Sequence, residues 1–307
     1  MAKYIVQRLL LAVVTILIIA IITFYLMNII PGGPFLSEKA PSAQVLEALE
    51  AKYGLDKPLH VQLFTYLKDF VKGDLGVSFK MQKNRAVTTI IGEMFPTSAK
   101  IGAISLVWAT IAGLFFGCLS AYKRGTLIDN ILRLVSSMGV ALPSFVTATV
   151  LLLMFSGVFK SVGLSDWKSY ILPCFTLGLS PMCYVTRYTR SSMLDALSQD
   201  YIRTAKAKGL KTSKILMKHA LRNALIPVIT YLGPMVAQLL TGTLVVETVF
   251  TIPGLGRYFV QSISNRDYPI IMGTTIFLAT FVIVMNLVVD VLYKVVDPRI
   301  ELSGGVD

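Results

Sequence analysis

The sequence predicts an all-α membrane protein with six transmembrane helices. Of its 307 residues, 54% are hydrophobic and only 15% are charged, and the mean hydropathy is +0.68. A soluble domain is nearer to a quarter charged. The apolar residues are gathered in long blocks, and blocks of about 18 or more residues are typical of membrane helices. Six blocks run approximately over residues 9–30, 101–122, 131–158, 170–188, 225–246 and 270–293.

The first and fourth blocks need separate justification. The first follows two basic residues, as a signal peptide would, but it exceeds the roughly 7 to 15 apolar residues of a signal core, and Pro31-Gly32-Gly33-Pro34 follows it. We therefore expect a retained membrane helix. The fourth contains Pro173 and Pro181, which membrane helices tolerate where neighbouring groups satisfy the freed carbonyls, and Arg187 is expected to end it.

The charge of the short loops predicts the orientation, because cytoplasmic loops carry an excess of Lys and Arg. With the N-terminus inside, the cytoplasmic segments hold Lys3, Arg8, Lys123, Arg124, Arg133, Arg187, Arg190, Arg203, Lys206, Lys208, Lys211, Lys214, Lys218, Arg222, Lys294 and Arg299, and the short outer loops hold only Lys160, Lys168, Arg257 and Arg266. Residues 31–100 are left out, because long loops translocate largely regardless of charge. Both termini of this multi-pass protein are thus expected in the cytoplasm.

Four segments follow from these expectations. They are residues 1–30 (N-terminal stub and first helix), 31–100 (an extracellular or periplasmic segment), 101–293 (a five-helix core with a cytoplasmic loop at 189–224) and 294–307 (a cytoplasmic tail). The outer segment is expected to be folded. Ser42 can cap a helix that Gly54 ends, and a second, amphipathic helix from about residue 59 to 72 would end at Gly73. Residues 73–76 are expected to form a turn.

The basic stretch 187–227 lies between the fourth and fifth blocks. It carries nine of the Lys and Arg residues above, each of which would cost roughly 2.5 to 3.5 kcal/mol at the bilayer centre, so it lies outside the membrane. Asp200 is expected to cap a helix of about two turns that Gly209 ends, and Thr212 or Ser213 to cap a second helix to about Asn223.

The short helix has little stability alone and needs a partner groove. Its small residues Thr204, Ala205, Ala207 and Gly209 would permit close approach to one. The alternative is a basic amphipathic loop that rests on anionic lipid headgroups.

Motifs along nearly the whole chain resemble the permeases of ABC importers. Their general loop pattern begins Glu-Ala-Ala, where this chain has Arg203-Thr204-Ala205, and its proline, here Pro227, comes five residues late. Both departures match the peptide-permease branch. The supporting motifs are DYIRTAKAKGL at 200–210, HALRNALIP at 219–227, TRSSML at 189–194, ETVF at 247–250, PGLGR at 253–257, RDYP at 266–269, DPRI at 297–300, RL at 8–9, IPG at 30–32, GLDKP at 54–58 and GDLG at 73–76. The chain resembles the first of the two permease subunits of oligopeptide or dipeptide importers.

The resemblance implies a type I ABC importer permease fold and a set of partners. These are a second homologous permease, two ATP-binding subunits, an extracellular or periplasmic peptide-binding protein and the peptide itself. The chain contains no G-x-x-x-x-G-K-[ST] phosphate loop, so ATP and Mg are expected on the partner ATPases, with no cofactor and no catalytic site in this chain. Outer segments 54–79 and 250–269 are expected to contact the binding protein.

Two sets of site residues are expected. Coupling to the ATPase is assigned to the loop 189–224 through Asp200, Tyr201, Arg203, Thr204, Ala205, Ala207, Lys208 and Gly209. The translocation pathway is assigned on polarity and kinking to Pro143, Ser144, Met235 and Gln238, for which helix packing is the competing explanation.

Other functions remain open. A permease of the same branch for nickel, glycans or another small solute would carry the same motifs. A stand-alone secondary transporter is disfavoured, because the sequence shows no intramembrane acidic relay and no inverted repeat. An intramembrane enzyme is disfavoured by the lack of a nucleophile–base pair or metal-ligand spacing, since the chain has only two His and three Cys residues. The net charge of +12 does not indicate nucleic-acid binding, because the basic residues that produce it lie beside the predicted membrane spans, where they set the topology.

Overall fold

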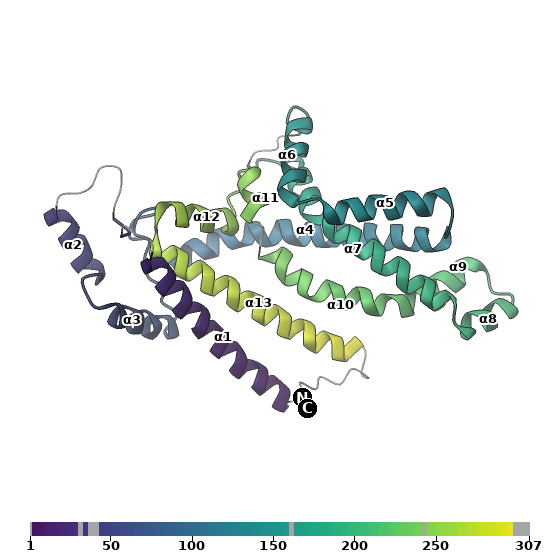
Figure 1. Ribbon diagram of the computed structural model, residues 1–307, viewed down its shortest axis with the longest axis horizontal. Helices are drawn as coiled ribbons and strands as arrows, with labels where there is room; N and C mark the ends of the chain where they lie inside the picture. The colour runs from purple at the N-terminus through teal and green to yellow at the C-terminus, as the bar shows by residue number, and fades with distance from the viewer. Residues whose placement is uncertain (1, 30–32, 36–42, 160–162, 242–243, 297–307) are drawn as a thin grey trace. The chain divides into compact units, whose positions relative to one another are not determined.

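The computed structural model describes residues 2–29, 33–35, 43–159, 163–241 and 244–296 (Figure 1). Over these residues the chain is helical, with one isolated antiparallel bridge between Val77 and Ala86. The all-α prediction is therefore confirmed for the described ranges. The proposed Ser42 cap and the motif at 297–300 lie outside them. The chain divides into two compact units, residues 1–97 with 254–283, and residues 98–253 with 284–307.

The first unit is built on two apolar clusters. Its elements are α1 (Ala2–Ile29), α2 (Ala43–Tyr53), α3 (Leu59–Val71), the start of α4 (Val87–Tyr122), α12 (Leu255–Asn265) and the start of α13 (Tyr268–Val296). In one cluster, residues 20, 24 and 27 of α1 pack with residues 271, 272 and 276 of α13. In the other, Val87, Ile90 and Ile91 of α4 pack with Leu255 and Ile270.

The two helices predicted in the outer segment are confirmed as α2 and α3. Each is followed by a glycine in the left-handed region, Gly54 with φ +69° and Gly73 with φ +83°. The expected turn at 73–76 is also present, where the Gly76 N–H donates to Asp74 Oδ1 over 2.8 Å. Glycine at these positions avoids the cost that a Cβ atom imposes on this backbone conformation.

The predicted second block, residues 101–122, lies within α4, which begins earlier, at Val87, and is 36 residues long. Such a helix measures roughly 54 Å, longer than the ~30 Å hydrocarbon core of a bilayer. Gly254 is the N-cap of α12, and the C-cap residue Arg266 ends that helix with φ +54°.

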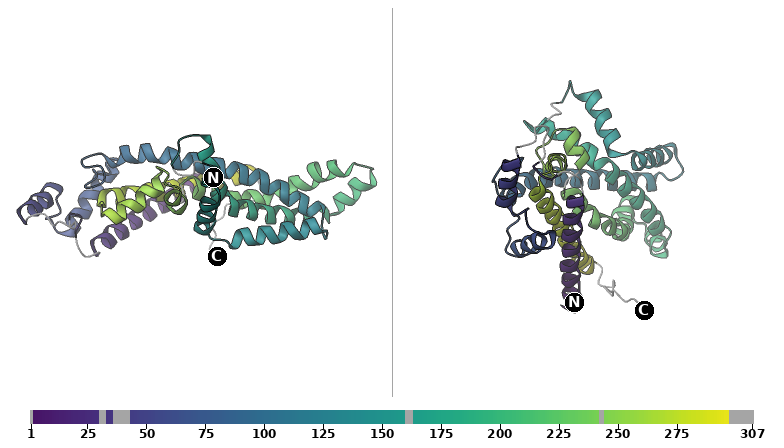
Figure 2. Two further views of the ribbon diagram at one scale, coloured as in Figure 1. Left: turned by 90° about the horizontal axis from the view of Figure 1, so that it is seen from above. Right: turned by 60° about the vertical axis from the view of Figure 1, so that its left-hand side comes forward.

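The second unit is organised around α7. Besides the rest of α4 and α13, its elements are α5 (Leu127–Ala141), α6 (Ser144–Phe155), η1 (Trp167–Tyr170), α7 (Ile171–Leu197), α8 (Asp200–Ala207), α9 (Thr212–Lys214), the π-helix η2 (Ile215–Ala220), α10 (Leu221–Leu240) and α11 (Leu244–Val249). Helix α7 packs against α5, α6 and α10. Figure 2 shows α8 and α9 at one end of this unit, beyond the last turns of α7.

Helix α4 approaches α7 closely at two glycines spaced four apart. A Cβ atom on Gly113 would lie 2.6 Å from Val185 Cβ, and one on Gly117 would lie 2.5 Å from Thr189 Cβ. Both distances are shorter than atoms can adopt without movement. Small residues at this spacing let membrane helices pack backbone to backbone, so these glycines set the separation of α4 and α7.

Four helical stretches of the described residues are long and apolar enough to cross a membrane. They are Val6–Ile29, Val87–Tyr122, Thr212–Val249 and Tyr268–Val291, and α5 with α6 makes a fifth if that bent pair is one span. The predicted third block is thus two helices that meet at 105°. Helix α7 covers the fourth block but does not pass this test, so the count of six stays a prediction. The fifth block, residues 225–246, falls within Thr212–Val249, where the structure describes α10 to Leu240 and α11 from Leu244.

Candidate functional site

Helix α8 is the short helix predicted in the basic stretch, with one end corrected. Its N-cap is Gln199, which makes no side-chain capping bond. Asp200 is therefore the first helical residue rather than the cap. Its negative charge in the first turn stabilises the helix by interacting with the positive end of the helix dipole. Helix α7 continues ten residues past Arg187, where the fourth block was expected to end, so α8 follows it after a very short connection.

The other end of α8 is confirmed at Gly209, which has φ +70°. The Gly209 N–H donates to Lys206 O over 2.9 Å, and the Leu210 N–H donates to Ala205 O over 3.3 Å. This pair of bonds is the Schellman motif, which satisfies carbonyls that the helix leaves unpaired. The sequence therefore ends α8 by a defined backbone conformation rather than by fraying.

One face of α8 belongs to the chain's own core. Ile202 is completely buried and Ala205 is 5% exposed, both in an apolar cluster with residues of α7, η2 and α10. The expectation that Ala205 faces a partner is therefore wrong. A small side chain at Ala205 lets α8 pack closely on the unit that carries it.

The opposite face of α8 is exposed and basic. The exposed residues are Tyr201, Arg203, Thr204, Lys206, Ala207, Lys208 and Gly209. Arg203 lies 3.4 Å from Asp200 in an ion pair that is almost fully exposed. The Tyr201 hydroxyl accepts a hydrogen bond from Asn223 Nδ2 at 2.8 Å, which ties α8 to α10. The predicted coupling residues other than Ala205 are thus available to a partner.

The helix after α8 differs from the prediction. Lys211 is its N-cap, without a side-chain bond, so neither Thr212 nor Ser213 caps it. It also does not stop near Asn223, since α9 leads through the π-helix η2 into α10, which ends at Leu240. The π-helix η2 changes the hydrogen-bond pattern without ending the helix. A continuous helical connection therefore joins the α8 region to the apolar part of α10.

The four expected pathway residues separate into two groups. Pro143 and Ser144 are exposed at the break between α5 and α6, where Pro143 is the N-cap of α6. Gln238 is exposed on α10. Met235 is only 5% exposed and packs in the main apolar cluster of the second unit, so the structure gives it a packing role.

An ion pair that was not predicted ties α5 to α7. The Arg190 guanidinium donates from Nε to Asp129 Oδ1 over 2.7 Å and from Nη2 to Oδ2 over 2.8 Å. The carboxylate also accepts from Ser120 Oγ and from the Gly125 N–H. Asp129 is 1% exposed. The only sequence signal was a lone acid in the first turn of an apolar, amphipathic helix, which requires a partner.

A second unpredicted carboxylate organises the outer segment. Asp267 is fully buried and accepts hydrogen bonds from Ser78 Oγ and from the N–H groups of Phe79, Lys80 and Met81, at 2.6 to 3.0 Å. Burial lowers the pKa of Lys80, the charge of Arg266 lowers it further, and Asp267 opposes both. Asp267 thereby joins residues 78–81 to the segment 250–269, one of the two segments that were expected to contact a binding protein.

Comparison with known proteins assigns the family. The family described as "Binding-protein-dependent transport system inner membrane component" matches residues 113–302, and the N-terminal region described for such membrane components matches residues 1–102. The chain is 45% identical over 305 residues to the dipeptide transport system permease protein DppB of Bacillus subtilis (strain 168), which covers 98% of this chain and 99% of that protein. It is 42% identical over 306 residues to the oligopeptide transport system permease protein OppB of Haemophilus influenzae, covering 98% and 100%.

Two solved structures share the fold at low sequence identity. The methionine ABC transporter MetNI, in an inward-facing conformation, gives a TM-score of 0.55 at 16% identity and covers 68% of this chain and 97% of its own. An amino acid ABC transporter gives 0.52 at 18% identity, covering 69% and 95%. The family is a membrane component and not the ATPase. With its several apolar helices and the type I ABC importer permease fold, this multi-pass membrane protein belongs to the family of binding-protein-dependent transport system inner membrane components.

Proposed function

We propose that the chain is the first permease subunit of an ATP-driven importer of dipeptides or oligopeptides, and that it forms half of the translocation pathway. Relatives named for dipeptide and oligopeptide transport match it over 98% of its length at 39 to 45% identity. The partners are a second homologous permease, two ATP-binding subunits that hold ATP and Mg, and a peptide-binding protein. This chain hydrolyses no ATP itself.

The observation that carries this proposal is the construction of α8. Ile202 and Ala205 anchor the helix in the chain's own core, while Arg203, Thr204 and Ala207 face outward. Gly209 ends it with a defined conformation. A short helix held firmly on one face and open on the other is suited to fit a groove on an ATPase and to transmit its closure.

The route of transmission is the helical connection behind α8. Tyr201 of α8 is bonded to Asn223 of α10, and the helix continues from α9 to Leu240. ATP and peptide must each favour one of the same two conformations for transport to be coupled. Displacement of α8 by the ATPase would shift α10, and with it the exposed Gln238, which we assign with Pro143 and Ser144 to the pathway.

The proposal also includes the orientation. With α8 on the ATPase side, both termini lie in the cytoplasm, and the outer segment faces the binding protein. The junction at Asp267 holds residues 78–81 against the start of α13, which gives the binding protein a preformed surface.

The experiment compares two substitutions of equal bulk. Ala207→Trp places an indole on the exposed face of α8, and Ser213→Trp places one on the nearby exposed surface of α9. We expect Ala207→Trp to abolish both co-purification of the ATPase subunits and dipeptide uptake, and Ser213→Trp to preserve both. If the two variants show equal ATPase co-purification and equal dipeptide uptake, α8 is not the docking element.

The cargo is tested in the same reconstituted complex. Proteoliposomes with the binding protein and all subunits should accumulate a labelled dipeptide or oligopeptide in an ATP-dependent manner and should not accumulate nickel or a glycan. Uptake of nickel or a glycan without peptide would assign the chain to another transporter of the branch. Uptake by the chain alone, driven by an ion gradient, would instead establish a secondary transporter.

A further inference from the structure

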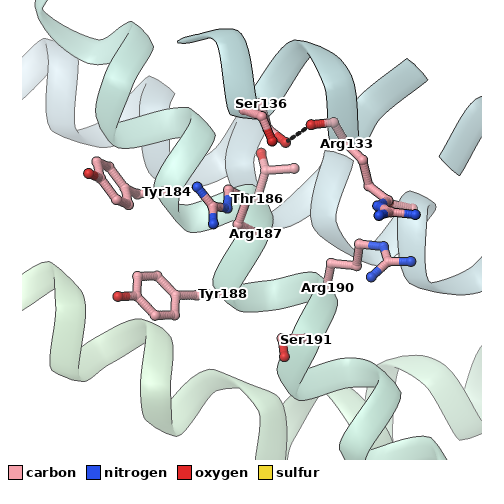
Figure 3. Close-up of a pocket in the computed structure, with 10 residues that line it drawn as sticks. Arg133, Ser136, Tyr184, Thr186, Arg187, Tyr188, Arg190 and Ser191 are labelled. Carbon is pink, nitrogen blue, oxygen red and sulfur yellow. Dashed lines mark hydrogen bonds between the residues drawn. The ribbon is translucent and has the colours of Figure 1, made fainter. Parts of the chain in front are cut away.

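A cavity of about 420 Å³ is lined by residues of α4, α5 and α7 (Figure 3). Its lining residues are Ser120, Arg133, Ser136, Ser137, Tyr184, Thr186, Arg187, Tyr188, Arg190 and Ser191. Figure 3 shows the guanidinium groups of Arg133 and Arg190 at one side, the rings of Tyr184 and Tyr188 at the other, and Arg187 between them. The volume is within the range of about 300 to 1,000 Å³ that small-molecule sites occupy.

The cavity carries a net positive charge. Asp129 neutralises the charge of Arg190 through their bidentate ion pair. Within the described ranges, neither Arg133 nor Arg187 forms an ion pair. No acidic residue is among those that line this cavity. Two positive charges therefore face a space that also offers hydroxyl donors.

The donors suit a phosphate group. A guanidinium presents a planar fork of N–H donors that matches phosphate oxygens, and bonds between ionised partners are stronger than neutral ones. Ser137, Ser191 and Tyr188 are exposed in the cavity wall and add neutral donors. Because Arg133 comes from α5 and Arg187 from α7, one phosphate between them would also link the two helices.

The cavity opens beside an apolar surface. Ser137 lines it, and Leu134 and Ala141 share its helix face by spacings of three and four residues. Leu134 is 62% exposed and Ala141 is also exposed. Arg187 and Arg190 follow directly on the apolar part of α7. A cavity lined by basic and hydroxyl side chains, beside exposed apolar residues, fits a molecule with an anionic head and a hydrocarbon tail.

We propose that this cavity binds the headgroup of an anionic phospholipid, with its phosphate between Arg133 and Arg187 and its acyl chains along Leu134 and Ala141. Basic pockets between transmembrane helices are a recognised means of binding such headgroups. The site lies outside α8 and the expected pathway residues, and it requires no particular cargo. The bound lipid would hold α5 and α7 together, in addition to the ion pair Asp129–Arg190.

The test measures lipid binding to the purified full chain in detergent. Phosphatidylglycerol, phosphatidylcholine and inorganic phosphate are titrated in turn, and bound lipid is detected by native mass spectrometry and by the melting temperature. The variants are Arg133→Gln with Arg187→Gln, the charge-conserving pair Arg133→Lys with Arg187→Lys, and the control Arg124→Gln, which removes an exposed charge outside the cavity.

We expect the double Gln variant to bind phosphatidylglycerol about thirtyfold more weakly, at roughly fivefold for each charge. The double Lys variant should lose much less affinity for phosphatidylglycerol, and Arg124→Gln should bind this lipid as tightly as the unsubstituted chain does. If the Gln pair fails to fold, the Lys pair decides the matter, since it must retain selectivity for phosphatidylglycerol over phosphatidylcholine.

Three results would overturn the proposal. Equal binding of phosphatidylglycerol and phosphatidylcholine would show no headgroup recognition. Inorganic phosphate that binds as tightly as the lipid would indicate a site for a soluble anion. Unchanged lipid binding in the Gln pair would show that the two arginines do not hold the headgroup, and loss of assembly with the second permease in the same variant would assign them to a protein interface.

Discussion

Arg190 on α7 and Asp129 on α5 are joined by two hydrogen bonds of 2.7 and 2.8 Å. The carboxylate is 1% exposed and the arginine side chain 21%. The remaining bonds to Asp129 come from Ser120 on α4 and from the backbone of Gly125. One carboxylate thus connects three helices where α5 begins, and its removal from water is compensated only while all these donors remain in place.

Arg190→Ala is expected to destabilise the chain strongly. It leaves the buried Asp129 charge with two neutral donors, and the loss of one partner from a buried ion pair typically costs about 3 to 5 kcal/mol in the free energy of unfolding. Arg203→Ala is the control, because the Arg203–Asp200 pair is almost fully exposed and such pairs contribute little. Melting temperatures in detergent compare them. Equal shifts would show that the buried pair contributes nothing particular.

Gly117→Ala is expected to destabilise the contact between α4 and α7. The added Cβ would lie 2.5 Å from Thr189 Cβ, and such overpacking costs typically about 1 to 3 kcal/mol. Gly92→Ala, in the same helix, meets no heavy atom within 4 Å and should stabilise the helix by roughly 0.5 to 1 kcal/mol. The two melting temperatures should therefore shift in opposite directions. A shift of the same sign would contradict the close packing.

Asp267→Ala is expected to release residues 78–81. Three backbone N–H groups and one hydroxyl lose their acceptor together, and each unsatisfied group costs about 1 to 3 kcal/mol if it stays buried. The segment should separate from α13 and exchange its amide hydrogens faster. Asp74→Ala, which removes one exposed bond to the Gly76 N–H, is the control. Unchanged exchange at residues 79–81 in Asp267→Ala would refute this role.

Gly209→Ala is expected to loosen the end of α8. The backbone there has φ +70°, which costs an L-residue other than glycine or asparagine roughly 1 to 2 kcal/mol. We expect faster amide exchange at Lys208 to Leu210 and less peptide transported per ATP hydrolysed. Gly209→Asn should be milder, because asparagine tolerates this conformation. Identical coupling in both variants and in the unsubstituted chain would show that the motif is dispensable.

Local features of the fold were predictable from the sequence. Gly54, Gly73 and Gly209 end α2, α3 and α8 as expected, because a glycine after an amphipathic stretch permits the left-handed conformation that stops a helix. The exposed face of α8 was predictable in part from the basic and small residues of that helix. These features depend on neighbouring residues alone.

Features that depend on distant residues were not predictable. Asp129 and Arg190 are 61 positions apart, and Asp267 lies more than 180 positions from the N–H groups it accepts from. The sequence grouped Ala205 with the other small residues of α8 as facing a partner. In the structure Ala205 is buried in the chain's own core, whereas those residues are exposed. Hydropathy merged α5 and α6 into one block, since it does not register a change in direction at Pro143.

The most direct test of the central claim is a photo-cross-link from α8 in the assembled transporter. A photoreactive amino acid replaces Ala207, on the exposed face of α8, and in a parallel sample it replaces Ser213 on α9. If α8 docks on the ATPase, position 207 will cross-link to an ATP-binding subunit with a yield that changes when ATP is added, and position 213 will give a much weaker product. Cross-links from position 207 only to lipid, or equal products from both positions, would contradict it.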